Sequence, residues 1–230
     1  MIRPIKLRRK RVLIDVDTQK DFLVASGSAC IKNHRRVLMN IRRAYAWARI
    51  KHIRVVSTAL CKASRNGDNL CIIGREGQKK VSYTLRHKRF IFEADNSTDI
   101  ARDLFIRFDQ IILNKRCENP FDEPRAERLL TELKADEFIV IGAIAEGAVA
   151  ATVLGLLQRG KRVVVLTDAI GAIDRHAADV AFRKMKAKGA ILAETKNIAG
   201  STHLHTAGVC DCKLCKASEK EEKLQTQASA

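Results

Sequence analysis

Short apolar runs alternate with amphipathic stretches along most of the chain. Seven runs have the length and the Val, Ile and Leu content of buried strands. They are residues 12–16, 53–57, 89–93, 110–114, 137–141, 162–167 and 190–193. Between them, apolar residues recur at helical spacing over residues 33–50, 99–108, 124–133, 149–159 and 177–188.

Residues near the helix ends support several of these boundaries. Ser97 precedes the stretch 99–108 as a candidate N-cap, and Pro124 stands in the first turn of its helix. Gly160 and Gly189 follow two of the predicted helices, as expected for residues that end a helix.

The alternation of strands and helices predicts an α/β fold. Continuously apolar strands are typical of a parallel sheet that helices cover on both faces. In such folds the functional residues lie where the strands end. The predicted ends are marked by Asp17, Asn114-Lys115, the segment 142–148 and Asp168-Ala169.

Composition fits one domain with two extensions. The chain has 230 residues, of which 46% are hydrophobic. We predict a basic N-terminal extension at 1–10, one domain at 11–200 and a Cys/His-containing tail at 201–230. The long connection 61–84 is rich in Gly, Asn and Lys, and long loops in compact domains are often functional.

The location of the protein in the cell can be predicted from its N-terminal segment, its longest apolar run and its cysteines. The basic start runs into Val12-Leu13-Ile14, which Asp15 interrupts, so we expect no signal peptide. The apolar run 138–157 contains Glu146, which would be costly in lipid. The odd number of cysteines favours reduced thiols over a disulfide framework. We therefore expect a cytoplasmic protein with no membrane association.

The net charge of +17 is large and suggests attraction to polyanions such as RNA or DNA. The alternative is a solvated basic surface, because much of this charge lies on the predicted exterior of helices. No recognised nucleic-acid motif is present, so the sequence favours the solvated surface.

Four segments together resemble the isochorismatase-like hydrolases, the superfamily that includes nicotinamidase and N-carbamoylsarcosine amidase. Asp17-Thr18-Gln19-Lys20-Asp21-Phe22 resembles the family's D-x-Q-x-D-F signature. Lys115 with Phe121 is similar to its K-x(5)-F element, and Thr167-Asp168-Ala169 to its strand-end D-A. The segment 142–149 is similar to G-v-x-T-[DE]-x-C-V. The resemblance covers roughly residues 10 to 195.

The resemblance implies a three-layer α/β/α fold with a six-stranded, mainly parallel sheet. It assigns Asp17 as general acid or base and Lys115 as its charge partner. It implies a non-proline cis peptide near Ala143-Ile144, which aims the N–H groups of Ile144 and residue 148 at an oxyanion. By the same resemblance, Phe22, Phe121 and Glu146 would line the substrate pocket.

The chain departs from the family pattern at the nucleophile, where Ala148 replaces cysteine. Ala145 and Gly147 are also smaller than the usual residues. Asp17 and Lys115 have simpler interpretations too, as a turn-capping carboxylate and a surface charge. A relocated thiol at Cys61, Cys71 or Cys117 is a further alternative, although free cysteines often only fill space.

Metal binding is expected only in the tail. The histidines of the nicotinamidase metal site have no counterpart after the second predicted strand, so we expect no metal or other cofactor in the central pocket. His203, His205, Cys210, Cys212 and Cys215 have ligand types that suit Zn²⁺. The alternative is a flexible tail, because this spacing matches no standard zinc finger.

Three functions remain open at this stage. The first is a hydrolase that acts on a small metabolite by Asp/Lys acid–base chemistry without a covalent intermediate, as in isochorismatases, which also carry a small residue at the nucleophile position. The second is a non-catalytic protein that binds a metabolite, a partner subunit or nucleic acid. The third is an amidase with a relocated thiol. We also expect a homo-oligomer.

Overall fold

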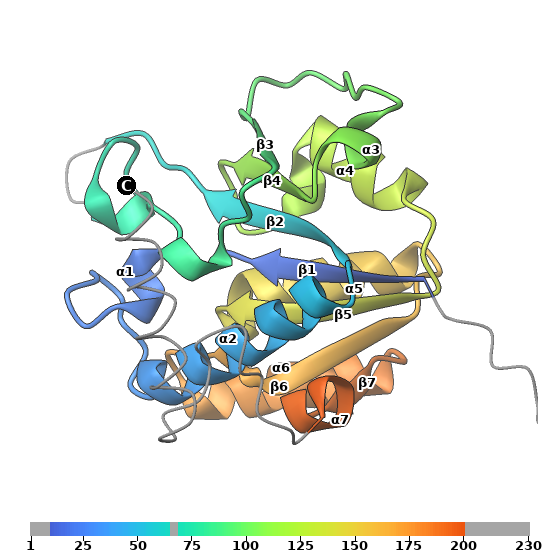
Figure 1. Cartoon of the computed structure of the whole chain (residues 1–230). Coiled ribbons are helices and arrows are strands. Elements are labelled where there is room, and N and C mark those ends of the chain that lie inside the picture. Colours follow the sequence, from blue (N-terminus) through green and yellow to red (C-terminus); the bar gives the residue numbers. More distant parts are fainter. Residues whose placement is uncertain (1–9, 65–68, 201–230) are drawn as a thin grey trace, which may run out of the picture.

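A seven-stranded parallel sheet forms the centre of the fold (Figure 1). The computed structural model describes residues 10–64 and 69–200. The strand order is β3-β4-β2-β1-β5-β6-β7, and every ladder is parallel. The strands are β1 (Arg11–Val16), β2 (Arg54–Leu60), β3 (Arg89–Phe92), β4 (Gln110–Lys115), β5 (Glu137–Ala143), β6 (Val163–Gly171) and β7 (Ile191–Ala193).

The count of six strands implied by the family resemblance is therefore wrong, whereas the apolar pattern predicted all seven. The two edge strands, β3 and β7, are short but fully paired on their inner side. Arg89 to Phe92 align with Gln110 to Leu113, and Ile191 to Ala193 align with Val164 to Leu166. These backbone ladders make both edges part of the sheet.

Helices cover both faces of the sheet, which confirms the three-layer α/β/α fold (Figure 1). The helices are α1 (Lys20–Leu23), α2 (His34–Ile50), α3 (Leu104–Arg107), α4 (Pro124–Glu132), α5 (Ala150–Gln158), α6 (Arg175–Ala187) and α7 (Thr195–Ala199). One core lies between the sheet and α2, the other between the sheet and α3 to α6. Residues of one strand alternate between the two cores: Leu13 belongs to the first, Val12 and Ile14 to the second.

The helix predicted over 99–108 is wrong for its first half, because only Leu104–Arg107 is helical. Polar side chains in the preceding segment bond to nearby backbone instead. Asp95 Oδ1 accepts from Ser97 N at 3.0 Å, and Ser97 Oγ accepts from Asp99 N at 3.0 Å. Such local bonds compete with a helix. Ser97 therefore caps a turn, and Asp103 precedes the helix.

The strand predicted over 162–167 continues to Gly171, so Asp168 and Ala169 lie inside β6 and not beyond its end. The ladder between β5 and β6 shifts register after Val140. Asp168 Oδ1 accepts from the backbone N–H and the hydroxyl of Thr195, both at 2.8 Å. Asp168 thus holds the start of α7, a helix that the apolar pattern did not predict.

The apolar run 138–157 forms strand β5, a tight turn and helix α5. Within residues 10–64 and 69–200, no helix is both long and apolar enough to cross a bilayer.

Candidate functional site

The predicted functional segments meet at the edge where the strands end. Asp17 follows β1, Lys115 ends β4, and the turn Ala145–Val149 follows β5. Strand β2 lies between β1 and β4, while β5 pairs with β1 on the other side. All strands run in the same direction, so these ends converge on one edge of the sheet.

Asp17 is held by β2 and by Lys115. Its backbone has a positive φ of 45°, and its N–H donates to Thr58 O at 3.2 Å. The Thr58 hydroxyl donates to Asp17 Oδ1 at 2.6 Å, and Lys115 Nζ donates to Oδ2 at 2.7 Å. The residue is only 1% exposed. Both carboxylate oxygens therefore have a protein donor.

Lys115 is fully buried and uses all of its donors. Besides Asp17, its ammonium donates to Cys117 O at 3.1 Å and to Glu118 O at 3.0 Å. A buried ammonium is stable only when it is paired and hydrogen-bonded. The structure thus brings the two residues of the predicted pair together, and Lys115 is not a surface charge.

The turn after β5 carries the vacant nucleophile position. The peptide bond between Ala143 and Ile144 is cis, as the resemblance implied. Ile144 O accepts from Gly147 N and from Val149 N, both at 3.1 Å. Ala148 is 5% exposed and ends in a methyl group, so this position offers no nucleophile. Its carbonyl accepts from the Thr152 hydroxyl at 2.7 Å.

Glu118 is a residue at this site that the sequence reasoning missed. Its carboxylate lies against Gly147, where an added Cβ would be 3.1 Å from Oε2. A larger residue at 147 would push this carboxylate away. Glu118 is exposed, and its own carbonyl accepts from Lys115. It therefore connects the buried pair to the turn. The clue in the sequence was Gly147, which stands where the family often has a larger residue.

The residues expected to line a pocket make other contacts. Glu146 Oε1 accepts from Ile173 N and Asp174 N, both at 2.9 Å, which ties the turn to the start of α6. Phe121 packs against Gly155, and the centroid of its ring lies 3.9 Å from the guanidinium carbon of Arg159. Phe22 is buried in the core beneath α2. The pocket assignment of these three side chains stays a prediction.

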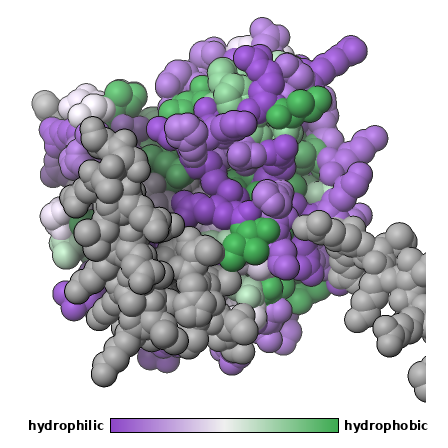
Figure 2. All heavy atoms as spheres, viewed as in Figure 1, coloured by the Kyte–Doolittle hydropathy of each residue, from purple (hydrophilic) through white to green (hydrophobic). Residues whose placement is uncertain are grey.

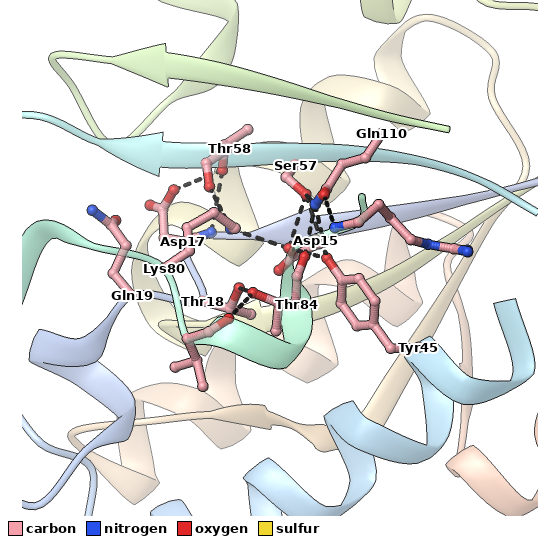
Figure 3. A network of polar contacts seen from close by, with 12 residues as sticks. Asp15, Asp17, Thr18, Gln19, Tyr45, Ser57, Thr58, Lys80, Thr84 and Gln110 are labelled. Atoms are coloured by element: carbon pink, nitrogen blue, oxygen red, sulfur yellow. Dashed lines mark hydrogen bonds and ion pairs between the residues drawn. The ribbon is translucent and has the colours of Figure 1, made fainter. Parts of the chain in front are cut away.

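A second buried ion pair, between Asp15 and Lys80, lies next to Asp17 (Figure 3). Lys80 Nζ lies 3.1 Å from Asp15 Oδ2 and donates to Thr58 O at 3.0 Å. The same oxygen of Asp15 accepts from Ser57 Oγ at 2.9 Å and from the Tyr45 hydroxyl. Gln110 Nε2 donates to Ser57 Oγ at 2.7 Å. Thr58 thus joins both pairs, and neither Asp15 nor Lys80 was a predicted site residue.

Comparison with known proteins decides the family. The model of the isochorismatase domain matches residues 11–197. The chain belongs to the isochorismatase family. No protein with a curated description matches it in sequence.

Several solved structures share the fold of this chain at low sequence identity. The chain is similar to a pyrazinamidase of Pyrococcus horikoshii in complex with zinc, with 20% identity, TM-score 0.63, and coverage of 80% of this chain and 99% of that one. It is similar to an isochorismatase from Pseudomonas putida KT2440, with 19% identity, TM-score 0.61, and coverage of 82% and 90%. It is also similar to the MAR1 ribonuclease from Caenorhabditis elegans, with 22% identity, TM-score 0.58, and coverage of 92% and 88%.

The buried cysteines of this isochorismatase-family domain are poor substitutes for the missing thiol. Burial raises the pKa of Cys61. Burial, followed by the nearby Asp21 carboxylate, raises the pKa of Cys71 still further. Both thiols therefore stay protonated at neutral pH, and the thiolate is the nucleophilic form. Cys117 is exposed two residues beyond Lys115.

No metal centre is built into the part of the domain that the structure describes. There, no group of three or more His, Cys, Asp or Glu side chains is arranged to hold a metal ion. The predicted tail ligands His203, His205, Cys210, Cys212 and Cys215 lie outside the described residues.

Proposed function

We propose that this isochorismatase-family protein is a hydrolase that acts on a small metabolite by non-covalent acid–base chemistry. The observation that carries the proposal is the buried contact of 2.7 Å between Asp17 and Lys115, at the sheet edge where Ala148 occupies the nucleophile position. In this proposal Asp17 transfers a proton to or from the substrate or a water molecule. Lys115 holds the carboxylate in place and balances its charge.

Ala148 excludes covalent catalysis through a cysteine at this position. Without a thiol no thioester forms at this position, so bond cleavage uses water or direct protonation of the substrate. The methyl group of Ala148 occupies less space than a thiol side chain. Helix α5 begins directly after the turn, and the partial positive charge of its N-terminus favours a negatively charged group nearby.

Access to Asp17 is part of the proposal. The carboxylate is 1% exposed, while the segment 116–118 beside it is exposed. This segment provides two of the three acceptors of the Lys115 ammonium. Movement of Glu118 away from Gly147 would open the space next to Ala148.

The test is turnover of isochorismate and related enol ethers by the full chain. General acid–base catalysis contributes about 10²–10⁴-fold, so Asp17→Asn should lower kcat/KM by at least about 100-fold. Asp103→Asn is the matched control, because Asp103 is an exposed carboxylate on α3's N-terminal side. Circular dichroism checks that both variants fold. Equal turnover by wild type and Asp17→Asn would overturn the role of Asp17.

The second candidate is a binding protein without catalysis. This candidate is favoured because protein groups already hydrogen-bond to both carboxylate oxygens of Asp17 and to all three donors of Lys115. For this candidate, a metabolite should raise the melting temperature of wild type and of Asp17→Asn equally, and no product should form. Product formed by wild type alone would exclude it.

A further inference from the structure

Basic residues gather where the strands begin. The segments that lead into β2, β3 and β6 are residues 51–54, 86–89 and 159–162, and each contains two or three Lys or Arg and no acid. Lys10 and Arg11 stand at the start of β1. In a parallel sheet all strands begin at one edge, so these basic segments lie at the same edge as Asp109 before β4 and Asp136 and Glu137 at the start of β5, and basic residues outnumber acids there. This edge lies opposite the one that carries Asp17 and Lys115.

A groove of about 1210 Å³ lies at this edge. Its basic lining comes from three segments, and no acidic side chain is among the described residues that line it. The basic residues are Lys10, Arg11, Lys51, His52, Arg54 and Lys134. Drug-sized ligand pockets hold about 300–1,000 Å³, so this groove exceeds the size of a single small metabolite.

Nearby acids neutralise only part of this charge. Glu137 is nearly buried and is shared by Arg11 at 2.9 Å and Arg162 at 3.3 Å. Asp109 pairs with Arg54. One carboxylate between two guanidinium groups leaves a positive charge at the surface. Residues 1–9 contain four more Lys or Arg and no acid, and they join the described structure at Lys10.

The groove also has an apolar component. Ile50, which is 45% exposed, lines it together with Trp47 and Phe105. Figure 2 shows the right side of the molecule above the grey atoms as mostly hydrophilic with hydrophobic residues between. Basic residues that alternate with exposed apolar surface match a polymer with charged phosphates and flat, weakly hydrated bases.

We propose that this groove binds a single strand of nucleic acid. Lys and Arg side chains contact the phosphates, and the bases pack against Ile50 and Phe105. A duplex keeps its bases stacked inside and would leave these apolar side chains unmatched. A lipid headgroup layer is flat and would not fill a concave site. The proposal is independent of the chemistry at Asp17.

The test measures fluorescence anisotropy of a labelled 12-nucleotide uridine RNA, the matching thymidine DNA and a 12-base-pair duplex, titrated with the full chain. Either single strand should bind more tightly than the duplex. If four to six phosphates are contacted, log K should fall against log salt with a slope of about −3 to −4, from about −0.7 per phosphate. A slope near zero would overturn the proposal.

Two matched charge variants locate the surface. Lys10→Gln, Lys51→Gln and Lys134→Gln combined should weaken single-strand binding at least tenfold. The control combines Lys32→Gln, Arg35→Gln and Arg36→Gln, which removes the same charge near the other end of α2, about 25 Å away for a 17-residue helix. It should change binding less than twofold. Equal losses in the two triple variants would overturn the groove as the site.

A third variant tests the contact with bases. Ile50→Gln should weaken binding of single strands severalfold and leave duplex binding unchanged, because only single strands offer free bases. Equal binding of duplex and single strands by wild type, or retention only on vesicles with 30% phosphatidylserine, would contradict the proposal and indicate a general polyanion or membrane surface.

Discussion

Two buried lysines, Lys80 and Lys115, each neutralise one aspartate at the end of β1. Their partners Asp15 and Asp17 are two residues apart, and Thr58 contacts both pairs. Removing one member of a buried pair leaves an uncompensated charge in a medium of low dielectric constant. A single substitution in either pair should therefore destabilise the fold strongly, whatever the chemistry at Asp17.

The adjacent residues Lys79 and Lys80 provide a test at the scale of the residue. Lys80→Met should lower the free energy of unfolding by about 3–5 kcal/mol, because it strands the Asp15 carboxylate. Lys79→Met is the control, since Lys79 is exposed and pairs with the exposed Glu76. It should leave the urea midpoint nearly unchanged.

A double variant separates charge from packing in this test. Asp15→Asn combined with Lys80→Met removes both charges and should recover part of the lost stability. Urea unfolding followed by circular dichroism measures all variants. Equal midpoints for Lys79→Met and Lys80→Met would contradict the assignment of a buried pair.

At the scale of the element, the turn from β5 to α5 depends on the close approach of β1 and β5. Gly142 has a φ of +131°, and a Cβ there would lie 1.9 Å from Val16 O. Both the backbone angle and the neighbouring strand require glycine. The pattern of the family segment placed this glycine correctly, but the strand that it touches follows only from the register of β1 with β5.

Gly142→Ala should therefore cost about 3 kcal/mol or more, because β1 must shift away from β5. Gly160→Ala is the matched control. Gly160 also has a positive φ, of 68°, but an added Cβ has no neighbour within 4 Å. Its cost should be about 1–2 kcal/mol from the left-handed conformation alone. Thermal unfolding of both variants checks this, and equal losses would show that the strand contact does not matter.

At the scale of the whole molecule, the two tyrosines of the chain report on the fold. Burial, and then the neighbouring Asp15 carboxylate, raise the pKa of Tyr45 well above its usual value, and burial also raises the pKa of Tyr83. A pKa that is higher in the folded than in the unfolded state means that stability is complete below the unfolded value, near pH 10. It is lost as the pH rises further.

The free energy of unfolding should therefore fall above about pH 10 by about 1.4 kcal/mol per pH unit for each tyrosine. The ultraviolet absorbance of tyrosinate should appear in one step together with the loss of circular dichroism. Tyr83→Phe should reduce the slope. Tyrosinate that forms gradually near pH 10 in a folded protein would contradict the burial of these side chains.

The sequence by itself determined the order and type of most elements, since hydrophobic periodicity and turn residues act locally. It also indicated the positions of Asp17, Lys115 and Ala148, because the segments of the family signature are short. It failed at 99–103, where local side-chain bonds replace the helix, and at the extension of β6. In both cases the apolar pattern of the sequence is the same whether or not the competing interactions form, so it could not reveal them.

Only the tertiary structure decided what surrounds the predicted pair. Lys80 reaches Asp15 across 65 positions of the chain, Glu118 lies on Gly147, and the basic segments before separate strands meet at one edge. These contacts depend on strand register and on loops that close over one another. Local periodicity carries no information about either, because it describes which face of an element is buried and not which element lies against it.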